Sequence, residues 1–177
     1  NIERLIRKYG KDSDVVRVRV YGEFPKAEPD AFMPLELVEI ATEREIEPIG
    51  RTLYIGVDVA RFGDDETVIA PRIGGKVFEL RGFNRQSTTE TTGRVIETCR
   101  MYIEQYRQIN DIIIRVDDDG VGGGVTDGLK EFFDYNPFPV QVQIVPMGNG
   151  RKAEDDEHYE NRGTEMWAAI RAFLTDN

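Results

Sequence analysis

The pattern of apolar and polar residues from position 51 onward predicts an alternation of strands and helices. Three short β-rich runs come first: "TLYIGVDV" (52–59), "ETVIAPRI" (66–73) and "KVFELRGF" (76–83). Short apolar runs bounded by turn residues are typical of strands. Gly74 and Gly75 separate the last two runs and indicate a tight hairpin. We therefore expect a three-stranded antiparallel meander.

A long helix and a buried strand are predicted next. Ser87 and Glu90 have the spacing of a capping box, which marks the start of a helix. Apolar residues then recur at steps of three and four, as on one face of a helix: Val95, Cys99, Tyr102, Tyr106 and Ile109. The run "DIIIRV" (111–116) is short and strongly apolar, so we expect it at the centre of the sheet, parallel to the first strand.

The rest of the chain predicts a helix, a strand and a last helix. Two further helical stripes and one strand carry this prediction: Val121, Val125, Leu129 and Phe132; "VQVQIV" (140–145); and Met166, Ile170 and Phe173 with Trp167 and Leu174. The predicted order is βββαβαβα. Residues 51–177 are therefore expected to form one α/β domain, a mixed five-stranded sheet (three-strand antiparallel meander plus parallel strands) flanked by helices.

The first fifty residues have a different character. In "DVVRVRVYGEFP" (14–25), Val16, Val18 and Val20 alternate with polar or aromatic residues, which predicts a half-buried strand. Three prolines then interrupt regular structure. We interpret residues 1–50 as an entry arm or the tail of a preceding domain, and the chain, which begins without Met, as a fragment of a longer protein.

Composition narrows the possible functions. The 177 residues are 40% hydrophobic, enough for a globular core. The formal net charge of -10 argues against a protein that coats nucleic acid by long-range attraction, although carboxylates gathered to bind cations are compatible with a nucleic-acid enzyme. No membrane span or signal peptide is present in the pattern, so we expect no membrane partner and no secretion. The single cysteine, Cys99, is interpreted as a buried thiol.

Three aspartates suggest a metal site. Asp58 lies near the end of the first predicted strand and Asp117 just past the fourth. Ligands gather at the carboxyl ends of neighbouring parallel strands, which are about 5 Å apart. Carboxylate oxygens suit Mg²⁺ or Mn²⁺, and two such ions can promote hydrolysis of a phosphodiester. Asp65, at the start of the second strand, is a candidate third ligand, through water.

Structural roles are the alternatives for several of these residues. A strand-end aspartate such as Asp58 is equally typical of a turn or a helix cap. Asp118 and Asp119 are predicted to cap the following helix. Gly122 and Gly123 are predicted to let a phosphate backbone approach, with a tight strand-to-helix turn as the alternative.

Other polar residues carry weaker predictions. His158 lies in an acidic segment, "EDDEHYE" (154–160), and is expected to be exposed and without a special role. Five basic residues are candidate phosphate contacts, against the alternative of ordinary surface charge: Arg61, Lys76, Arg151, Lys152 and Arg162.

Three segments together resemble a known family. "YIGVDVARFGDDETVIA" (54–70), "IIIRVDDDGVGGGVTDGL" (112–129) and "ENRGTEMWAAIRAFL" (160–174) are similar to the nuclease domain of the large terminase subunit of tailed bacteriophages, and "VRVYGEFP" (18–25) resembles the segment that joins it to the packaging ATPase. The resemblance implies a ribonuclease H-like fold and a two-metal endonuclease, using Mg²⁺ or Mn²⁺, that cuts concatemeric double-stranded DNA. It also implies the portal protein and the small terminase subunit as partners, and a site of action in the host cytoplasm, transiently docked on the viral procapsid.

The resemblance carries over residue by residue. Asp58 matches the first-strand metal ligand, Asp117 the fourth-strand ligand and Asp65 an acidic position beside the first motif. Asn161 and Arg162 match the start of the family's late helix. The family completes its site with another acidic residue after that helix. Because Asp176 falls in the helix-terminal turn, too early for that position, we expect a domain that lacks its C-terminal end.

Two other functions stay open at this point. "GVDVARFGDDETV" (56–68) also resembles the first phosphate motif of actin-like and sugar-kinase ATPases, but no second glycine-rich phosphate loop accompanies it. A non-enzymatic module that docks on the portal would also suit an acidic chain.

Overall fold

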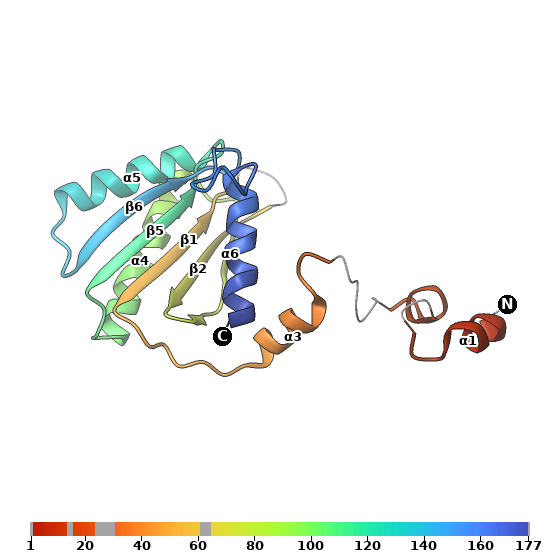
Figure 1. Cartoon of the computed structure of the whole chain (residues 1–177). Helices are drawn as coiled ribbons and strands as arrows, with labels where there is room; N and C mark the ends of the chain where they lie inside the picture. Colours follow the sequence, from red (N-terminus) through yellow and green to blue (C-terminus); the bar gives the residue numbers. More distant parts are fainter. Residues whose placement is uncertain (1, 14–15, 24–30, 61–64, 177) are drawn as a thin grey trace. The chain divides into compact units, whose positions relative to one another are not determined.

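The structure, a computed structural model, describes residues 2–13, 16–23, 31–60 and 65–176. The chain forms two compact units, one of residues 46–164 and one of residues 1–45 with 165–177. Figure 1 shows their elements, and the two units are described separately below. The domain boundary expected near residue 50 stays a prediction.

The larger unit is built on a mixed β-sheet. Its strands are β1 (Thr52–Asp58), β2 (Glu66–Ile73), β3 (Lys76–Val77), β4 (Arg81–Asn84), β5 (Asp111–Asp117) and β6 (Gln141–Met147). They lie in the order β3-β2-β1-β5-β6, and β4 also pairs with β2. β1 is antiparallel to β2 and parallel to β5, and β6 is parallel to β5. The predicted fold class, a mixed sheet of antiparallel and parallel strands flanked by helices, is confirmed, with six strands where five were predicted.

One predicted strand is divided in two. The run 76–83 forms β3 and β4, which pair in succession along one edge of β2. Between them the Phe78 ring packs edge-on against Tyr102, at 4.9 Å between centroids, and lies 5.5 Å from Tyr106. The Phe78 N–H still donates to the Pro71 carbonyl of β2 at 3.0 Å, so the interruption between β3 and β4 follows Phe78, where its ring packs against the end of α4.

Two helices cover one face of the sheet, α4 (Thr88–Gln105) and α5 (Gly122–Tyr135) (Figure 1). Alternate residues of the two central strands are buried on this face: Leu53, Ile55, Val57, Ile112, Ile114 and Val116. Val95, Cys99 and Tyr102 of the predicted α4 stripe are buried among them. A fully buried aliphatic side chain contributes about 2 kcal/mol of transfer free energy, so this shared layer fixes the pairing of β1 with β5.

Cys99 is a buried thiol, as predicted. Burial raises the pKa of Cys99 to about 12, because the thiolate would lose its hydration. The side chain therefore belongs to the core and offers no nucleophile at neutral pH. Separately, no helix among the described residues has the length and apolar character needed to cross a membrane.

The predicted capping box at the start of α4 is present. The Ser87 hydroxyl accepts a hydrogen bond from the Glu90 backbone N–H at 3.2 Å, and the Glu90 carboxylate accepts one from the Ser87 N–H at 2.8 Å. Hydrogen bonds to the backbone and side chain of Ser87 lower the pKa of Glu90. The Ser87→Ala substitution is expected to lower the free energy of unfolding by about 1 kcal/mol in urea titrations at pH 7.

The pH dependence of this cap follows from the lowered pKa. A carboxylate with a depressed folded-state pKa stabilises the fold above its unfolded pKa of 4.5, and this contribution is lost as the pH falls through the folded value. The stability difference between the protein and its Glu90→Gln variant should therefore shrink below about pH 4. Thr89→Ala, at an exposed position of the same turn, is the control, and an equal pH response of both variants would contradict the assignment.

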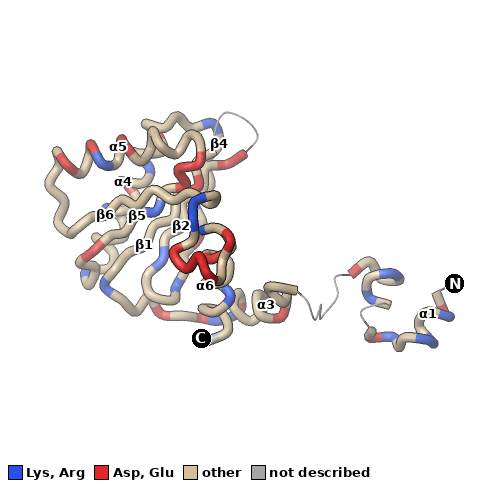
Figure 2. The backbone as a smooth tube through the Cα atoms, turned by 45° about the horizontal axis from the view of Figure 1, so that its top comes forward, with Lys and Arg blue, Asp and Glu red and all other residues tan. Residues whose placement is uncertain are grey.

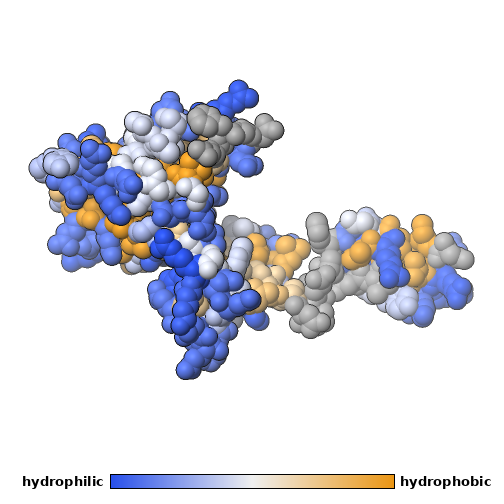
Figure 3. Space-filling view, turned by 90° about the horizontal axis from the view of Figure 1, so that it is seen from above, coloured by the Kyte–Doolittle hydropathy of each residue, from blue (hydrophilic) through white to orange (hydrophobic). Residues whose placement is uncertain are grey.

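The smaller unit is helical in its described residues. It contains α1 (Ile2–Tyr9), the π-helix η1 (Arg17–Tyr21), α3 (Leu35–Glu43) and most of α6 (Arg162–Asp176). The strand predicted for this region is wrong, because Arg17–Tyr21 is a π-helix that ends at Gly22 in the left-handed conformation, φ 69°. Asp14 and Val15 lie outside the described residues. Apolar side chains of α1 and α3 are exposed, as the orange areas of Figure 3 show.

Candidate active site

The ends of β1 and β5 bring two aspartates together. Val57 of β1 pairs with Val116 of β5 in parallel register, so the next residues, Asp58 and Asp117, lie side by side at the carboxyl ends of adjacent strands. Adjacent strands are about 4.8 Å apart. Because Val57 and Val116 face the buried core, Asp58 and Asp117 both fall on the opposite face of the sheet. Figure 2 shows acidic positions in red at this end.

Asp117 is oriented by its neighbours. One carboxylate oxygen accepts the backbone N–H of Asp119 at 3.1 Å, and the other accepts the side-chain amide of Asn149 at 3.4 Å. The backbone N–H of Asn149 donates to Asp119 at 2.8 Å, and the Asp118 N–H donates to the Met147 carbonyl at 2.7 Å. These hydrogen bonds therefore fix the turn after β5 against the turn after β6. Asn149 was missed by the sequence analysis, because no local pattern connects it with Asp117.

Asp118 and Asp119 do not cap α5, which corrects the prediction. The N-cap residue is Val121, and no side chain caps it. The Asp118 carboxylate instead accepts a hydrogen bond from the Thr126 hydroxyl at 3.0 Å and forms an ion pair with Arg151 at 3.6 Å. Both aspartates tie the turn after β5 to neighbouring elements, so the charge of Asp118 is compensated within the protein.

The glycines after Asp117 have a structural requirement. A Cβ atom on Gly122 would lie 1.7 Å from the carbonyl oxygen of Asp117, so the first turn of α5 packs directly on the end of β5. A Cβ on Gly123 would meet only the Asp118 carboxylate, at 3.7 Å. Gly120 has φ +98°, which favours glycine. The tight strand-to-helix turn is thus present, and contact of Gly122 or Gly123 with a phosphate stays a prediction.

Asp65 lies just before β2 and is exposed. In the antiparallel register Asp58 pairs with Val68, so Asp65 is near the same end of the sheet but beyond the paired residues. Among the described residues, no group of three His, Cys, Asp or Glu side chains is placed to hold a metal ion. The pair of Asp58 and Asp117 is therefore the centre of the candidate site, and the role of Asp65 as a third ligand stays a prediction.

The basic candidates fall in different places. Lys76 pairs with Ile73, and Ile73 pairs with Leu53, so Lys76 lies at the end of the sheet opposite Asp58. Arg151 lies beside the acidic turn. Lys152 forms an ion pair with Asp156, and Arg162 forms one with Glu154 at 2.9 Å. Arg61 lies outside the described residues.

The loop after β6 carries the only histidine of the chain. His158 is exposed, as expected, and its Nδ1 lies 2.9 Å from the Asp155 carboxylate. This hydrogen bond lowers the pKa of Asp155. The contact is local to the loop. It therefore gives no reason to place His158 at the pair of Asp58 and Asp117.

Comparison with known proteins bears on the family. No family model matches the chain. A protein of Enterobacteria phage P7 described as "Probable terminase, large subunit" is 25% identical over 164 residues, which cover 87% of this chain and 31% of that protein. The chain thus spans about a third of the length of the relative it matches.

Solved structures bear on the fold. The nuclease domain of the large terminase subunit gp2 of bacterial virus Sf6 matches with a TM-score of 0.56 and 14% identity, covering 82% of this chain and 64% of that one. A mutant of the same domain, solved with manganese and beta-thujaplicinol, matches with a TM-score of 0.59 and 15% identity over the same shares. The resemblance to terminase large subunits is confirmed, as is the ribonuclease H-like fold.

Proposed function

We propose that this chain, which has the fold of a terminase nuclease domain, is the DNA-cleaving part of a phage packaging terminase and acts as a divalent-metal-dependent endonuclease. One observation carries the proposal: Asp58 and Asp117 end adjacent parallel strands on the same face of the sheet. In open α/β sheets, ligands bind where such strands end. The resemblance to phage terminases implies the substrate class, DNA.

The two aspartates suit a divalent cation. No ion pair among the described residues involves Asp58 or Asp117, whereas Arg151 neutralises Asp118. Two neighbouring carboxylates with no ion-pair partner in the described part of the chain repel each other, and a hard cation with oxygen ligands relieves that repulsion. A mutant of the Sf6 nuclease domain was solved with manganese and, in another structure, with calcium, which supports a divalent ion for this fold.

Each residue has a defined role in the proposed centre. Asp58 and Asp117 hold the ion, Asn149 orients Asp117, and Asp65 completes the ligand set, through water. Mg²⁺ or Mn²⁺, as two ions when the set is complete, would supply an activated water molecule and stabilise the charge on the leaving oxygen. By holding the ion at the ends of β1 and β5, the carboxylates would determine where the phosphodiester binds.

DNA would approach this end of the sheet along the start of α5. Gly122, which is buried against the end of β5, and Gly123 begin α5, and a helix N-terminus favours a phosphate, so we propose that phosphate approaches the backbone here. Arg151, Lys152 and Arg162 lie on the loop and helix that follow β6, and we propose that they contact flanking phosphates. Lys76 lies at the opposite end of the sheet, so it would contact only DNA that extends past that end.

The proposal includes the setting in which this chemistry occurs. The substrate would be concatemeric double-stranded DNA, cut when packaging begins and ends. The portal protein and the small terminase subunit would be the partners, in the host cytoplasm and transiently on the procapsid. These statements concern the whole terminase, of which the chain spans about a third in its relative.

Plasmid cleavage tests the proposal. Supercoiled plasmid should become nicked and then linear when incubated with the chain and Mn²⁺ or Mg²⁺, and should stay intact with EDTA. Calorimetric titration with Mn²⁺ measures ion binding separately. Intact DNA under every metal condition, with no heat of metal binding, would overturn the nuclease proposal and favour the portal-docking alternative. Thermal stabilisation by ATP would instead favour the ATPase alternative.

The Asn149→Ala variant tests the orienting role. Residues that position metal ligands typically change metal affinity by about 10- to 100-fold. Because Asn149 donates to Asp117, its loss is expected to weaken Mn²⁺ binding about tenfold in the same calorimetric titration. Asn136→Ala removes a similar amide at the far end of α5 and should leave binding unchanged. Equal affinities in both variants would show that Asn149 has no such role.

A further inference from the structure

The outer edge of β6 has no strand partner among the described residues, because β6 is the last strand in the sheet order. The Gln141 N–H donates to the Asn110 carbonyl at 3.2 Å, and the Met147 carbonyl accepts from Asp118 at 2.7 Å. These odd-numbered residues therefore direct their peptide groups toward β5. The peptide groups of Val142 and Ile144 consequently face the outer edge, where another strand could pair with them.

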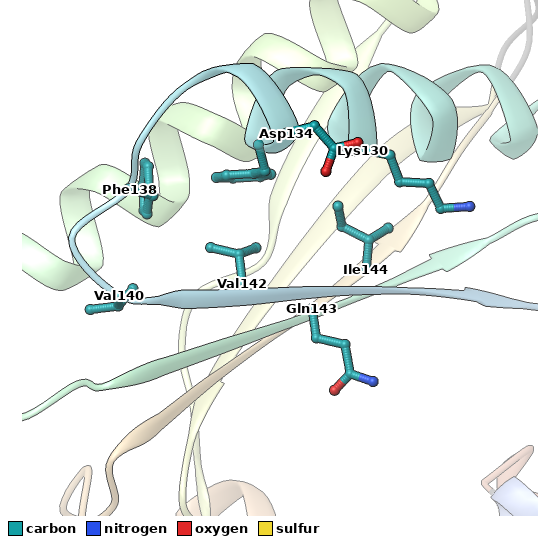
Figure 4. Close-up of a pocket in the computed structure, with 8 residues that line it drawn as sticks. Lys130, Asp134, Phe138, Val140, Val142, Gln143 and Ile144 are labelled. Atoms are coloured by element: carbon teal, nitrogen blue, oxygen red, sulfur yellow. The ribbon is translucent and has the colours of Figure 1, made fainter.

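A groove of about 390 Å³ lies beside this edge, between β6 and α5. Figure 4 shows Val142 and Ile144 pointing toward α5, while Gln143 points to the other side of the strand. Phe133 forms part of the groove and packs edge-on against Phe138, at 5.1 Å between centroids. The groove thus has apolar walls from β6 and the phenylalanines beside charged side chains of α5, and its size accepts a few aliphatic side chains.

The two edges of the sheet differ in their protection. The opposite edge consists of the short strands β3 and β4, which carry Lys76 and Arg81. Interruptions and charges of this kind prevent pairing with other chains. The sequence of β6, "QVQIVPM", has seven residues and no charge. Its edge is therefore suited to pair with an added strand until Pro146, which lacks an N–H group.

The charges around the groove indicate the kind of partner. Lys130 and Asp134 of α5 line it, and Asp127 and Glu131 are exposed on the same helix. Acidic residues outnumber basic ones on this helix surface, and the whole chain has a net charge of -10. This charge complements a basic segment and disfavours a second copy of the same acidic chain.

We propose that an extended, basic segment of a partner protein binds here by adding a strand to β6. Two aliphatic side chains at alternate positions of the segment occupy the groove, and a flanking lysine or arginine pairs with Asp134. Main-chain hydrogen bonds to Val142 and Ile144 provide affinity, and the groove provides selectivity. The site is separate from the carboxylate pair and does not depend on the nuclease proposal.

A short labelled peptide tests this site. The probe is fluorescein-Lys-Val-Thr-Ile-Thr-Lys-amide, and its control is fluorescein-Lys-Val-Ile-Thr-Thr-Lys-amide, which has the same composition without the alternation. Fluorescence polarisation should show saturable binding of the probe and at least about tenfold weaker binding of the control. Two further probes carry a single N-methyl group, one at Ile and one at the Thr that follows it. Only one of the two should lose binding, because alternate N–H groups of a paired strand face β6.

Variants of the chain locate the contact. Val142→Thr keeps a β-branched residue and should weaken the probe about tenfold. Asp134→Lys, at an exposed position, should weaken it as well and leave plasmid nicking unchanged. Absence of saturable binding to the unmodified chain, or binding by both variants as tight as that of the unmodified chain, would overturn the proposal. A dimer in sedimentation equilibrium that Val142→Thr dissociates would also overturn it, by assigning the edge to a second copy.

Discussion

The Asp58→Asn and Asp117→Asn variants are each expected to nick plasmid at least about 100-fold more slowly than the unmodified chain, a rise of about 2.7 kcal/mol in the activation free energy. Asparagine keeps the size of the side chain but removes the charge that holds the cation. Since the two residues end paired strands, each substitution removes half of the same anionic centre. The rate of loss of supercoiled plasmid in Mn²⁺ measures the effect.

Asp127→Asn is the matched control for this pair. It removes one negative charge from an exposed position of α5 and should leave the nicking rate unchanged. Thermal unfolding of the two active-site variants should match the unmodified chain within about 0.5 kcal/mol or show a gain, because a repulsive contact is removed. Nicking at the unmodified rate by both variants would assign the activity to other residues or to a contaminating nuclease.

The Gly122→Ala variant is expected to lose about 3 kcal/mol of folding free energy. The added methyl group would lie 1.7 Å from the Asp117 carbonyl oxygen, which is backbone and cannot rotate away. The first turn of α5 must then move off the end of β5. Urea titration followed by circular dichroism measures the loss, and a decrease of about 10 °C in the melting temperature should accompany it.

Gly123→Ala is the control for Gly122→Ala. Its methyl group would make an ordinary contact, 3.7 Å from the Asp118 carboxylate, and alanine favours a helix over glycine by about 1 kcal/mol. This variant should therefore be as stable as the unmodified chain or slightly more so. A similar loss in both variants would mean that general flexibility of the glycine run, rather than close packing at Gly122, governs stability.

The sheet of the larger unit was predictable because its strands have strong local signals. The period-two burial of β2 and the apolar run of β5 decide which residues face the core, and a glycine hairpin fixes the start of β3. From these, the parallel pairing of β1 with β5 follows, and with it the juxtaposition of Asp58 and Asp117. This part of the site depends on one long-range contact, the pairing of β1 with β5.

The errors occur where the outcome depends on distant partners. Val16, Val18 and Val20 alternate as in a strand, but a strand needs another strand to pair with, and residues 17–21 form a π-helix instead. The run 76–83 is interrupted after Phe78, the residue whose ring contacts Tyr102 and Tyr106 at the end of α4. Local periodicity shows neither whether a pairing strand is available nor which aromatic side chains meet in the fold.

The surroundings of the aspartates were also hidden in the sequence. Asn149 reaches Asp117 from the turn after another strand, and Asp118 binds Thr126 and Arg151 instead of capping α5. Lys76 was grouped with the phosphate contacts, although strand register places it at the far end of the sheet. Which side chains meet across these turns depends on the register of β1, β5 and β6. Composition and residue spacing do not specify that register.

The pairing of β1 with β5 has a consequence for biosynthesis. The ribosome releases Asp58 well before Asp117, with the meander and α4 made in between. Contacts between segments so far apart in a chain form slowly, because a large loop must close first. A nascent polypeptide therefore carries isolated acidic residues and no assembled pair until β5 has emerged and docked, so the proposed cleavage activity would appear only after this region has been synthesised.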